Sequence, residues 1–223
     1  MSPMSTDVST DMSPDASTDV STDVSTDPGI VTGADGIPRC FWAGAAPDYL
    51  AYHDDEWGVA VRGERALFER LSLEAFQSGL SWLTILRKRP AFRSAFAEFD
   101  AEVVARLGEA DRQRLLADVG IVRNAAKIDA TIANARAILA LRETCGAEAL
   151  DELIWSHAPA RHTPPAHRGQ VRATTPESIA LAKDLKRHGF RFVGPTTAYA
   201  AMQACGLVDD HLVGCHRSGR ARG

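Results

Sequence analysis

LLADVGIVRNAAKI, residues 115–128, contains the most informative turn of the chain. Apolar residues before Asp118 have helical spacing, Gly120 permits a tight turn, and a second helical pattern starts about five residues later. This is the outline of two helices joined by a hairpin. Backbone N–H groups exposed at such a turn, and at the start of the next helix, can bind a phosphate. Any glycine turn between helices has this pattern, so by itself it indicates only a helical architecture.

Apolar residues at helical spacing continue on both sides of this turn. The pattern starts at Glu64 and meets Pro90, where we expect the helix to end or restart. Segment 157–174, rich in Pro, His and Arg, is expected to be a long loop. No run of β-branched residues alternates convincingly, so the predicted fold class is all-α. The expected helices begin near residues 64, 82, 100, 124, 175 and 196.

The N-terminal 38 residues differ in composition from the rest. Residues 5–28 repeat a four-residue unit, STDV in its commonest form, without any aromatic or basic residue. Such a segment cannot bury enough apolar surface to offset the entropy lost on ordering it, and a period of four is too short for a solenoid. We therefore expect a disordered tail over residues 1–38 and one folded domain over residues 39–223.

The tail also changes the charge balance. Seven of the 29 acidic residues lie in residues 1–38, which contain no Lys or Arg, so residues 39–223 carry 25 basic and 22 acidic residues and a formal charge of +3. A mildly basic domain permits nucleic-acid binding without showing it. The sequence contains neither a membrane-spanning apolar run nor a signal peptide, and its four cysteines do not form a secreted disulfide pattern. The expected location is the cytoplasm, with reduced thiols.

Two cysteines and two histidines stand near the two ends of the expected domain. Cys40 and His53 lie near its start, and His211 and Cys215 lie near its end. Two Cys and two His make a closed tetrahedral zinc set, which would join the two ends of the domain. The alternative is that they are unrelated core or surface residues, and spacing alone favours that alternative because no CxxC pair is present.

Aromatic residues concentrate in the first part of the domain. Phe41, Trp42, Tyr49, Tyr52 and Trp57 fall within seventeen residues, and Trp82 follows. By residue type they are a small aromatic core, and the functional alternative is a stacking pocket for a flat or cationic ligand. Nearby, Glu74 shares the apolar stripe of its expected helix. Periodicity alone makes it a boundary residue that reaches solvent, and a pocket carboxylate is the alternative.

Several stretches together resemble one protein family. They are RCFWAG, YLAYHDDEWGV, LFERLSLEAFQSGLSW, VGIVRNAAKI, NARA, LKRHGFRFVGPTT and MQACGLVDDH followed after three residues by Cys215. In this order they resemble the bacterial constitutive type I 3-methyladenine DNA glycosylases, from residue 39 to about residue 216. The AYHDDEWG and LEAFQSGLSW segments are the most specific.

The resemblance implies a helix-hairpin-helix glycosylase fold with one structural zinc ion. By matching position, the implied zinc ligands are Cys40, His53, His211 and Cys215, and His216 is a possible competitor for the metal. The implied catalytic residue is Glu74, and Leu80 matches the residue that fills the gap left by an extruded nucleotide. Gly120 and Arg123 are implied to contact DNA. The base-binding residues implied are Trp82, Tyr52, Trp42, Trp57 and Tyr49.

The implied activity is base-excision repair: hydrolysis of the N-glycosidic bond of 3-methyladenine in double-stranded DNA, by a monomer. Bifunctional relatives cut the strand through a hairpin lysine that forms a Schiff base. Their pattern places Asn124 at that position, Lys127 lies three residues on, and no Asp occurs between residues 130 and 150, where Arg142 stands near the usual aspartate position. We therefore expect no strand cleavage. The alternatives are a non-catalytic zinc-containing DNA-binding module and, less favoured, a zinc hydrolase.

Overall fold

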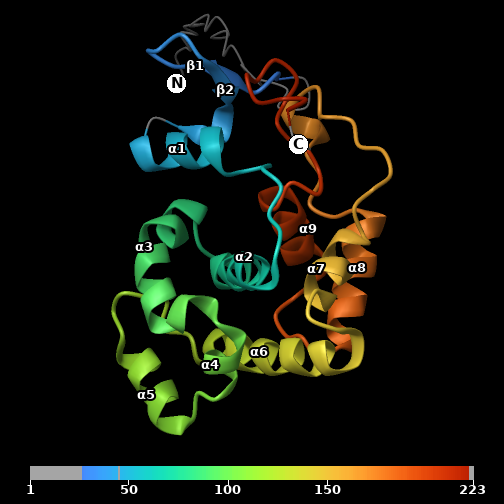
Figure 1. The fold of residues 1–223 in the computed structure, drawn as a ribbon. Helices are drawn as coiled ribbons and strands as arrows, with labels where there is room; N and C mark the ends of the chain where they lie inside the picture. Colours follow the sequence, from blue (N-terminus) through green and yellow to red (C-terminus); the bar gives the residue numbers. More distant parts are fainter. Residues whose placement is uncertain (1–26, 45, 221–223) are drawn as a thin grey trace, which may run out of the picture.

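The computed structural model describes residues 27–44 and 46–220. In this part of the chain the fold is mostly helical and includes one two-stranded antiparallel sheet, in which Ile30 of β1 faces Cys40 of β2 (Figure 1). The elements are β1 (Ile30–Thr32), β2 (Pro38–Cys40), η1 (Phe41–Ala43), α1 (Pro47–Asp55), α2 (Glu64–Gln77), α3 (Trp82–Ala95), η2 (Ala97–Phe99), α4 (Ala101–Ala105), α5 (Glu109–Ala117), α6 (Ala125–Cys145), α7 (Ala149–Trp155), η3 (Arg168–Gln170), α8 (Pro176–Arg187) and α9 (Pro195–Ala204).

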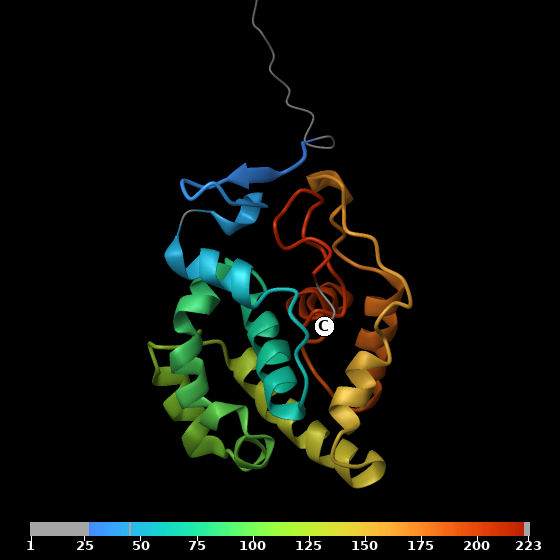
Figure 2. The same ribbon diagram turned by 45° about the horizontal axis from the view of Figure 1, so that its top comes forward.

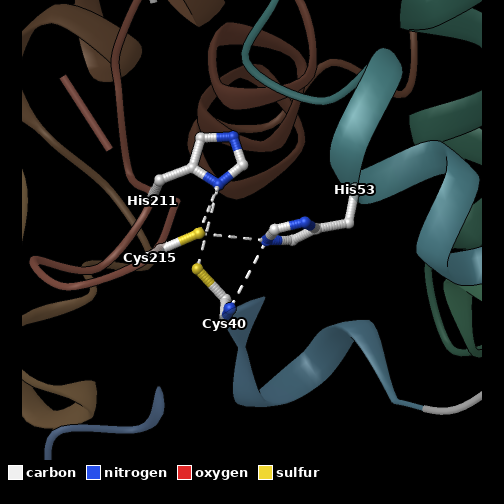
Figure 3. Close-up of side chains that lie close together, drawn as sticks. All are labelled: Cys40, His53, His211 and Cys215. Carbon is white, nitrogen blue, oxygen red and sulfur yellow. Dashed lines mark hydrogen bonds between the residues drawn. The ribbon is translucent and has the colours of Figure 1, made fainter. Parts of the chain in front are cut away.

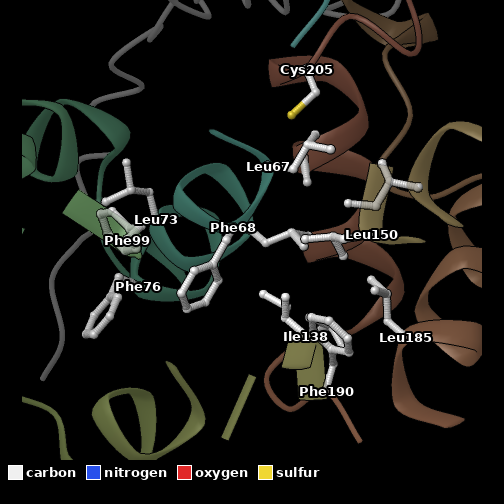
Figure 4. Close-up of a cluster of buried hydrophobic side chains, with 14 of the residues drawn as sticks. Leu67, Phe68, Leu73, Phe76, Phe99, Ile138, Leu150, Leu185, Phe190 and Cys205 are labelled. Atoms are coloured by element: carbon white, nitrogen blue, oxygen red, sulfur yellow. The ribbon is translucent and has the colours of Figure 1, made fainter. Parts of the chain in front are cut away.

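Helix α2 occupies the centre of the molecule. It contacts α3 on one side and α9 on the other, and α6 runs beneath both groups of helices (Figures 1 and 2). Leu67, Phe68 and Leu73 of α2 are fully buried. Leu67 and Phe68 face the side of the core that holds Ile138 and Leu150, and Leu73 lies beside Phe99 (Figure 4). Burial of each such side chain stabilises the fold by roughly 1.5–3 kcal/mol. Helix α2 is therefore held firmly in the core of the fold.

Local signals set several helix starts as predicted. The Asp100 carboxylate accepts hydrogen bonds from the amides of Glu102 and Val103 at the start of α4. The Asn124 side chain accepts from the Lys127 amide at the start of α6, and Thr175 accepts from the Ser178 amide at the start of α8. The long loop between α7 and α8 is also confirmed, with η3 as a short helical turn inside it.

One expectation about elements is wrong. Helix α3 does not end at Pro90 but continues to Ala95, and beyond the proline it buries Phe92 and Ala95 in the core. That burial outweighs the hydrogen bond which a proline cannot donate. The mostly helical fold class is confirmed, and the pairing of β1 with β2, each only three residues long, is an addition to it.

Part of the segment that composition assigned to the tail makes contacts with the folded domain. Residues 30–32 pair with residues 38–40, and the Asp27 carboxylate forms an ion pair with Arg168 at 3.0 Å. Pairing with β2 and with the loop after α7 therefore holds residues that composition assigned to the tail. The predicted disorder of the repeat at residues 5–26 lies outside the described residues.

Among the described residues, no helix combines the length and apolar character needed to cross a bilayer.

Candidate active site and metal centre

A cavity of about 230 Å³ lies where η1 and α1 meet α2, α3 and α9. Aromatic rings supply most of its wall, from the segment that connects β2 to α1, from α1 itself and from the start of α3. It is lined by Phe41, Trp42, Tyr49, Tyr52, Trp57, Glu74, Gln77, Trp82, Val171, Ala200, Gln203, Asp210 and Leu212. All six residues that the resemblance implies for base binding and catalysis are in this set.

The aromatic rings pack edge to face or tilted. The Trp42 and Trp57 ring centroids are 4.8 Å apart at 74°, and those of Tyr52 and Trp82 are 5.2 Å apart at 44°. Trp82 is 8% exposed, and its buried indole N–H has no hydrogen-bond acceptor among the described residues. A buried indole N–H usually has a partner, so this one is available to a ligand.

Glu74 is buried in the cavity wall. It is 6% exposed, and no described residue hydrogen-bonds its carboxyl group. Burial raises the pKa of Glu74 to about 8, against the opposing charge of Arg70. Glu74 is therefore not a boundary residue whose carboxyl group reaches solvent. It is held ready to accept hydrogen bonds or to meet a positive charge.

Three polar cavity residues had not been picked out from the sequence. Gln77 ends α2, one turn after Glu74, Gln203 lies on α9, and Asp210 immediately precedes His211. The Asp210 carboxylate accepts hydrogen bonds from Tyr199 at 2.7 Å and from Gln203 at 2.6 Å, and it pairs with His162 at 2.9 Å. Burial would raise the pKa of Asp210, but these partners outweigh it and hold the pKa below its usual range. The cavity thus holds one unpartnered and one well-partnered carboxyl group.

The four expected metal ligands come together beside the cavity (Figure 3). Cys40 ends β2, His53 lies on α1, and His211 and Cys215 lie in the segment after α9. The Cys40 Sγ–His211 Nδ1, Cys215 Sγ–His53 Nε2 and Cys215 Sγ–His211 Nδ1 distances are 3.8, 3.5 and 3.7 Å. All four side chains are buried, and their ligand atoms lie within 4.8 Å of one another.

These distances fit one tetrahedral ion. Zinc bonds of about 2.3 Å to sulfur and about 2.0–2.1 Å to nitrogen place sulfur and nitrogen ligands about 3.6 Å apart. The other nitrogen of each imidazole has an oxygen partner, as metal-bound histidines usually do: His53 Nδ1 lies 2.8 Å from an Asp54 oxygen and His211 Nε2 lies 3.0 Å from the Trp57 carbonyl oxygen. His216 Nε2 also lies 2.9 Å from Asp54.

The close approach of His211 also explains a glycine in the EWGV stretch. Gly58 has a φ of +79°, and a Cβ there would lie 3.1 Å from His211 Nε2. A side chain at this position would be strained and would displace the imidazole from the Trp57 carbonyl.

The predicted hairpin lies between α5, which ends at Ala117, and α6, which begins at Ala125. Arg123 is exposed in this connection, and Val119 at its tip is 73% exposed. The turn packs against α3, because the Lys88 ammonium donates to the carbonyls of Val119 and Gly120 at 2.8 and 3.2 Å. A Cβ on Gly120 would approach Ala91 to 2.9 Å, so this packing requires glycine.

Leu80 and Lys127 lie close to the same region. Leu80 is 42% exposed in the turn between α2 and α3. Lys127 is 7% exposed, and its ammonium donates to the carbonyls of Phe76 and Ser78 at 2.9 and 2.6 Å. The lysine thus points toward the end of α2.

The sequence profile of the methyladenine glycosylases matches residues 42–218, which are most of the chain and include every cavity-lining residue except Phe41. The chain belongs to the methyladenine glycosylase family. Among characterised relatives of this methyladenine glycosylase, DNA-3-methyladenine glycosylase 1 of Escherichia coli is 46% identical over 182 residues, which cover 80% of this chain and 96% of the relative. DNA-3-methyladenine glycosylase of Haemophilus influenzae is 44% identical over 180 residues, covering 79% and 96%.

Solved structures agree with this assignment. A crystal structure of 3-methyladenine DNA glycosylase I has a TM-score of 0.76 and 46% identity, covering 80% of this methyladenine glycosylase and 98% of that chain. A variant of 3-methyladenine DNA glycosylase I in complex with 3-methyladenine has a TM-score of 0.77 and 33% identity, with 82% and 99% coverage. The mostly helical architecture is therefore that of the family.

Proposed function

We propose that this chain removes 3-methyladenine from DNA by hydrolysis of its N-glycosidic bond, as a base-excision repair enzyme. One observation carries the proposal: a buried carboxyl group without a hydrogen-bonding partner, that of Glu74, faces an aromatic cavity in a member of the methyladenine glycosylase family. Two curated relatives and a liganded structural neighbour that share 33–46% identity are named for 3-methyladenine.

The cavity chemistry suits a cationic purine. Adenine methylated at N3 carries a positive charge, so rings such as Trp82 and Trp42 can stabilise it by roughly 0.5–2 kcal/mol per good cation–π contact. The Glu74 carboxyl group can accept from the exocyclic amine, and the positive base favours its ionised form. Tyr52, Trp57 and Tyr49 complete the proposed base-binding set. Undamaged adenine is neutral and gains less in this pocket, which gives selectivity.

The proposed DNA contacts lie on the hairpin side of the cavity. A base inside a duplex has to be extruded before it can enter such a pocket. We assign the connection between α5 and α6 as a helix-hairpin-helix motif that holds a DNA phosphate, with Gly120 and Arg123 as its DNA-contacting residues. Leu80, exposed between α2 and α3, is assigned to the gap left by the extruded nucleotide.

The proposed reaction uses water and leaves the strand intact. A cationic base leaves as a neutral molecule, so strong acid catalysis at the leaving group is not required. Asn124 stands where bifunctional relatives carry the reactive lysine, and its side chain caps α6. The Lys127 ammonium is buried against two carbonyls. Borohydride trapping on DNA containing 3-methyladenine should therefore give no covalent adduct, and an adduct that disappears in Lys127→Ala would show a lyase instead.

We assign one zinc ion to Cys40, His53, His211 and Cys215. Four protein ligands would leave no position for a reactive water, so the ion would be structural and would join the two ends of the domain. Neither a zinc hydrolase nor a DNA-binding module without catalysis would need an aromatic cavity that contains Glu74. We further propose that the protein acts as a monomer, and that it acts in the cytoplasm, where its four free cysteines would stay reduced.

Base-release chromatography on methylated DNA tests the activity. The wild-type protein should release free 3-methyladenine, and Glu74→Gln should release it more slowly at equal DNA binding. DNA binding without base release by the wild type would favour the non-catalytic module.

A further inference from the structure

Lys127 is a buried cation without a carboxylate partner. It is 7% exposed, and no described acidic group lies within ion-pair distance of its ammonium. Burial lowers the pKa of Lys127. A buried charge is costly unless its donors are satisfied, so the two backbone acceptors of this lysine are the structural reason for its position.

Those acceptors lie at the end of helix α2. The carbonyls of Phe76 and Ser78 receive no hydrogen bond from a following turn of the helix, because the chain leaves the helix at Ser78, where ψ is 115°. Carbonyls at a helix C-terminus carry partial negative charge, which an ammonium group stabilises. Gly79 follows with a φ of +82°, and the Leu80 amide donates to the Gln77 carbonyl at 2.7 Å. Lys127 therefore holds the tight turn that presents Leu80.

The other end of the lysine belongs to the hairpin. Lys127 is the third residue of α6, and its own amide is capped by the Asn124 side chain at 3.1 Å. The preceding turn is fixed to α3 by Lys88. A single side chain thus connects the first turn of the hairpin's second helix to the Leu80 turn and to Gln77 at the cavity edge.

We propose that Lys127 is a positioning residue that couples DNA binding at the hairpin to base extrusion at the Leu80 turn. This inference rests on the proposed function, in which the hairpin holds DNA and Leu80 fills the vacated stack. Its role is to keep Leu80 in register with DNA held at the hairpin; it neither contacts the base nor takes part in bond breaking. Loss of the ammonium should separate binding of the free base from extrusion of the base in DNA.

The test is Lys127→Met, which keeps the length and apolar stem of the side chain and removes its donors. Single-turnover excision from saturating DNA should fall on the order of 10- to 100-fold, the cost of misplacing a supporting group by about 1 Å. In DNA with the stable analogue 3-deaza-3-methyladenine, a neighbouring 2-aminopurine should brighten less than with the wild type. Affinity for free 3-methyladenine, read by tryptophan quenching, should remain within about twofold, because the cavity wall is intact.

Lys186→Met is the matched control, since Lys186 is an exposed lysine on α8. It should leave excision and the 2-aminopurine signal unchanged, and Lys127→Arg, which keeps N–H donors, should recover part of the loss. Unchanged excision in Lys127→Met overturns the proposal, and so does a loss of free-base affinity as large as the loss of excision. If Lys127→Met fails to fold, Lys127→Gln is read by the same two criteria. Absence of excision by the wild type would instead overturn the proposed function, while the analogue would still test the coupling.

Discussion

The Glu74 carboxyl group gives the proposed activity a defined pH dependence. Its pKa is raised to about 8 by burial, so in the free enzyme it gains its charge only as the pH approaches 8. If the ionised form binds the cationic base, kcat/KM for excision should rise with pH and level off above about 8. Glu74→Gln should be slower and lose this inflection. A wild-type profile that is flat from pH 6 to pH 9 would contradict the role of the carboxylate.

The same substitution should change stability in a predictable direction. The pKa in the folded protein lies above the ordinary value of 4.5, so the folded state holds a proton that the unfolded state loses between these values. The contribution of protonated Glu74 to the free energy of unfolding is therefore fully present below pH 4.5 and is lost as the pH rises through about 8. Glu74→Gln removes this pH-dependent loss, which amounts to a few kcal/mol of unfolding free energy at most. Its Tm should exceed the wild-type Tm at pH 9 and match it at pH 4; equal Tm values at pH 9 would show that Glu74 is solvated.

At the scale of elements, four cysteine and histidine side chains bring β2, α1 and the segment after α9 together. Cys40, His53, His211 and Cys215 come from three separate elements, and zinc would connect them. Metal analysis should show about one equivalent in the wild type. Cys40→Ala should lose the metal and several kcal/mol of unfolding free energy.

Cys145→Ala is the matched control, because Cys145 is an exposed cysteine at the end of α6. It should retain both the metal and the Tm. A metal-free wild-type protein with a full cooperative transition would end the zinc assignment.

Helix starts could be predicted from sequence because a cap is a local signal. Asp100, Asn124 and Thr175 each satisfy amides two or three residues further on. The continuation of α3 through Pro90 depends on burial of Phe92 by distant elements, which no local pattern contains. Strand β1 likewise exists because β2 pairs with it, and three residues are too few to show an alternation.

At the scale of the whole molecule, the start of the fold can be located by truncation. Described contacts begin at Asp27, which pairs with Arg168, and β1 follows at Ile30. Deletion of residues 2–26 should therefore leave excision and Tm nearly unchanged. Deletion of residues 2–37 removes β1 and should lower Tm, because Cys40 loses its paired strand beside the metal ligands. Equal Tm values for the two deletions would show that the stable fold begins only after residue 37.

The site as a whole was predictable only in part. Its aromatic residues are close in sequence, but His53 and Cys215 are 162 positions apart, so residue type could offer them as a zinc pair while spacing argued against it, and the family resemblance was needed to favour the pairing. Asp210 was missed although it adjoins a proposed ligand, because its partners Tyr199, Gln203 and His162 come from other segments. Residue type shows what a side chain can do, whereas burial and partners decide whether it does so.

Two backbone amides donate to the sulfur atoms of the proposed metal ligands, so hydrogen exchange can report on this centre. The Leu212 amide donates to Cys40 Sγ at 3.3 Å, and the Arg217 amide donates to Cys215 Sγ at 3.5 Å. They lie in a segment after α9 that has neither helix nor strand among its described residues, so sulfur replaces the carbonyl acceptors of regular structure. These amides should take up deuterium slowly while the ligands are held and quickly once a chelator frees them. The central amides of α2 should keep their protection for longer, so the order of deuterium uptake would trace how the two ends of the domain come apart.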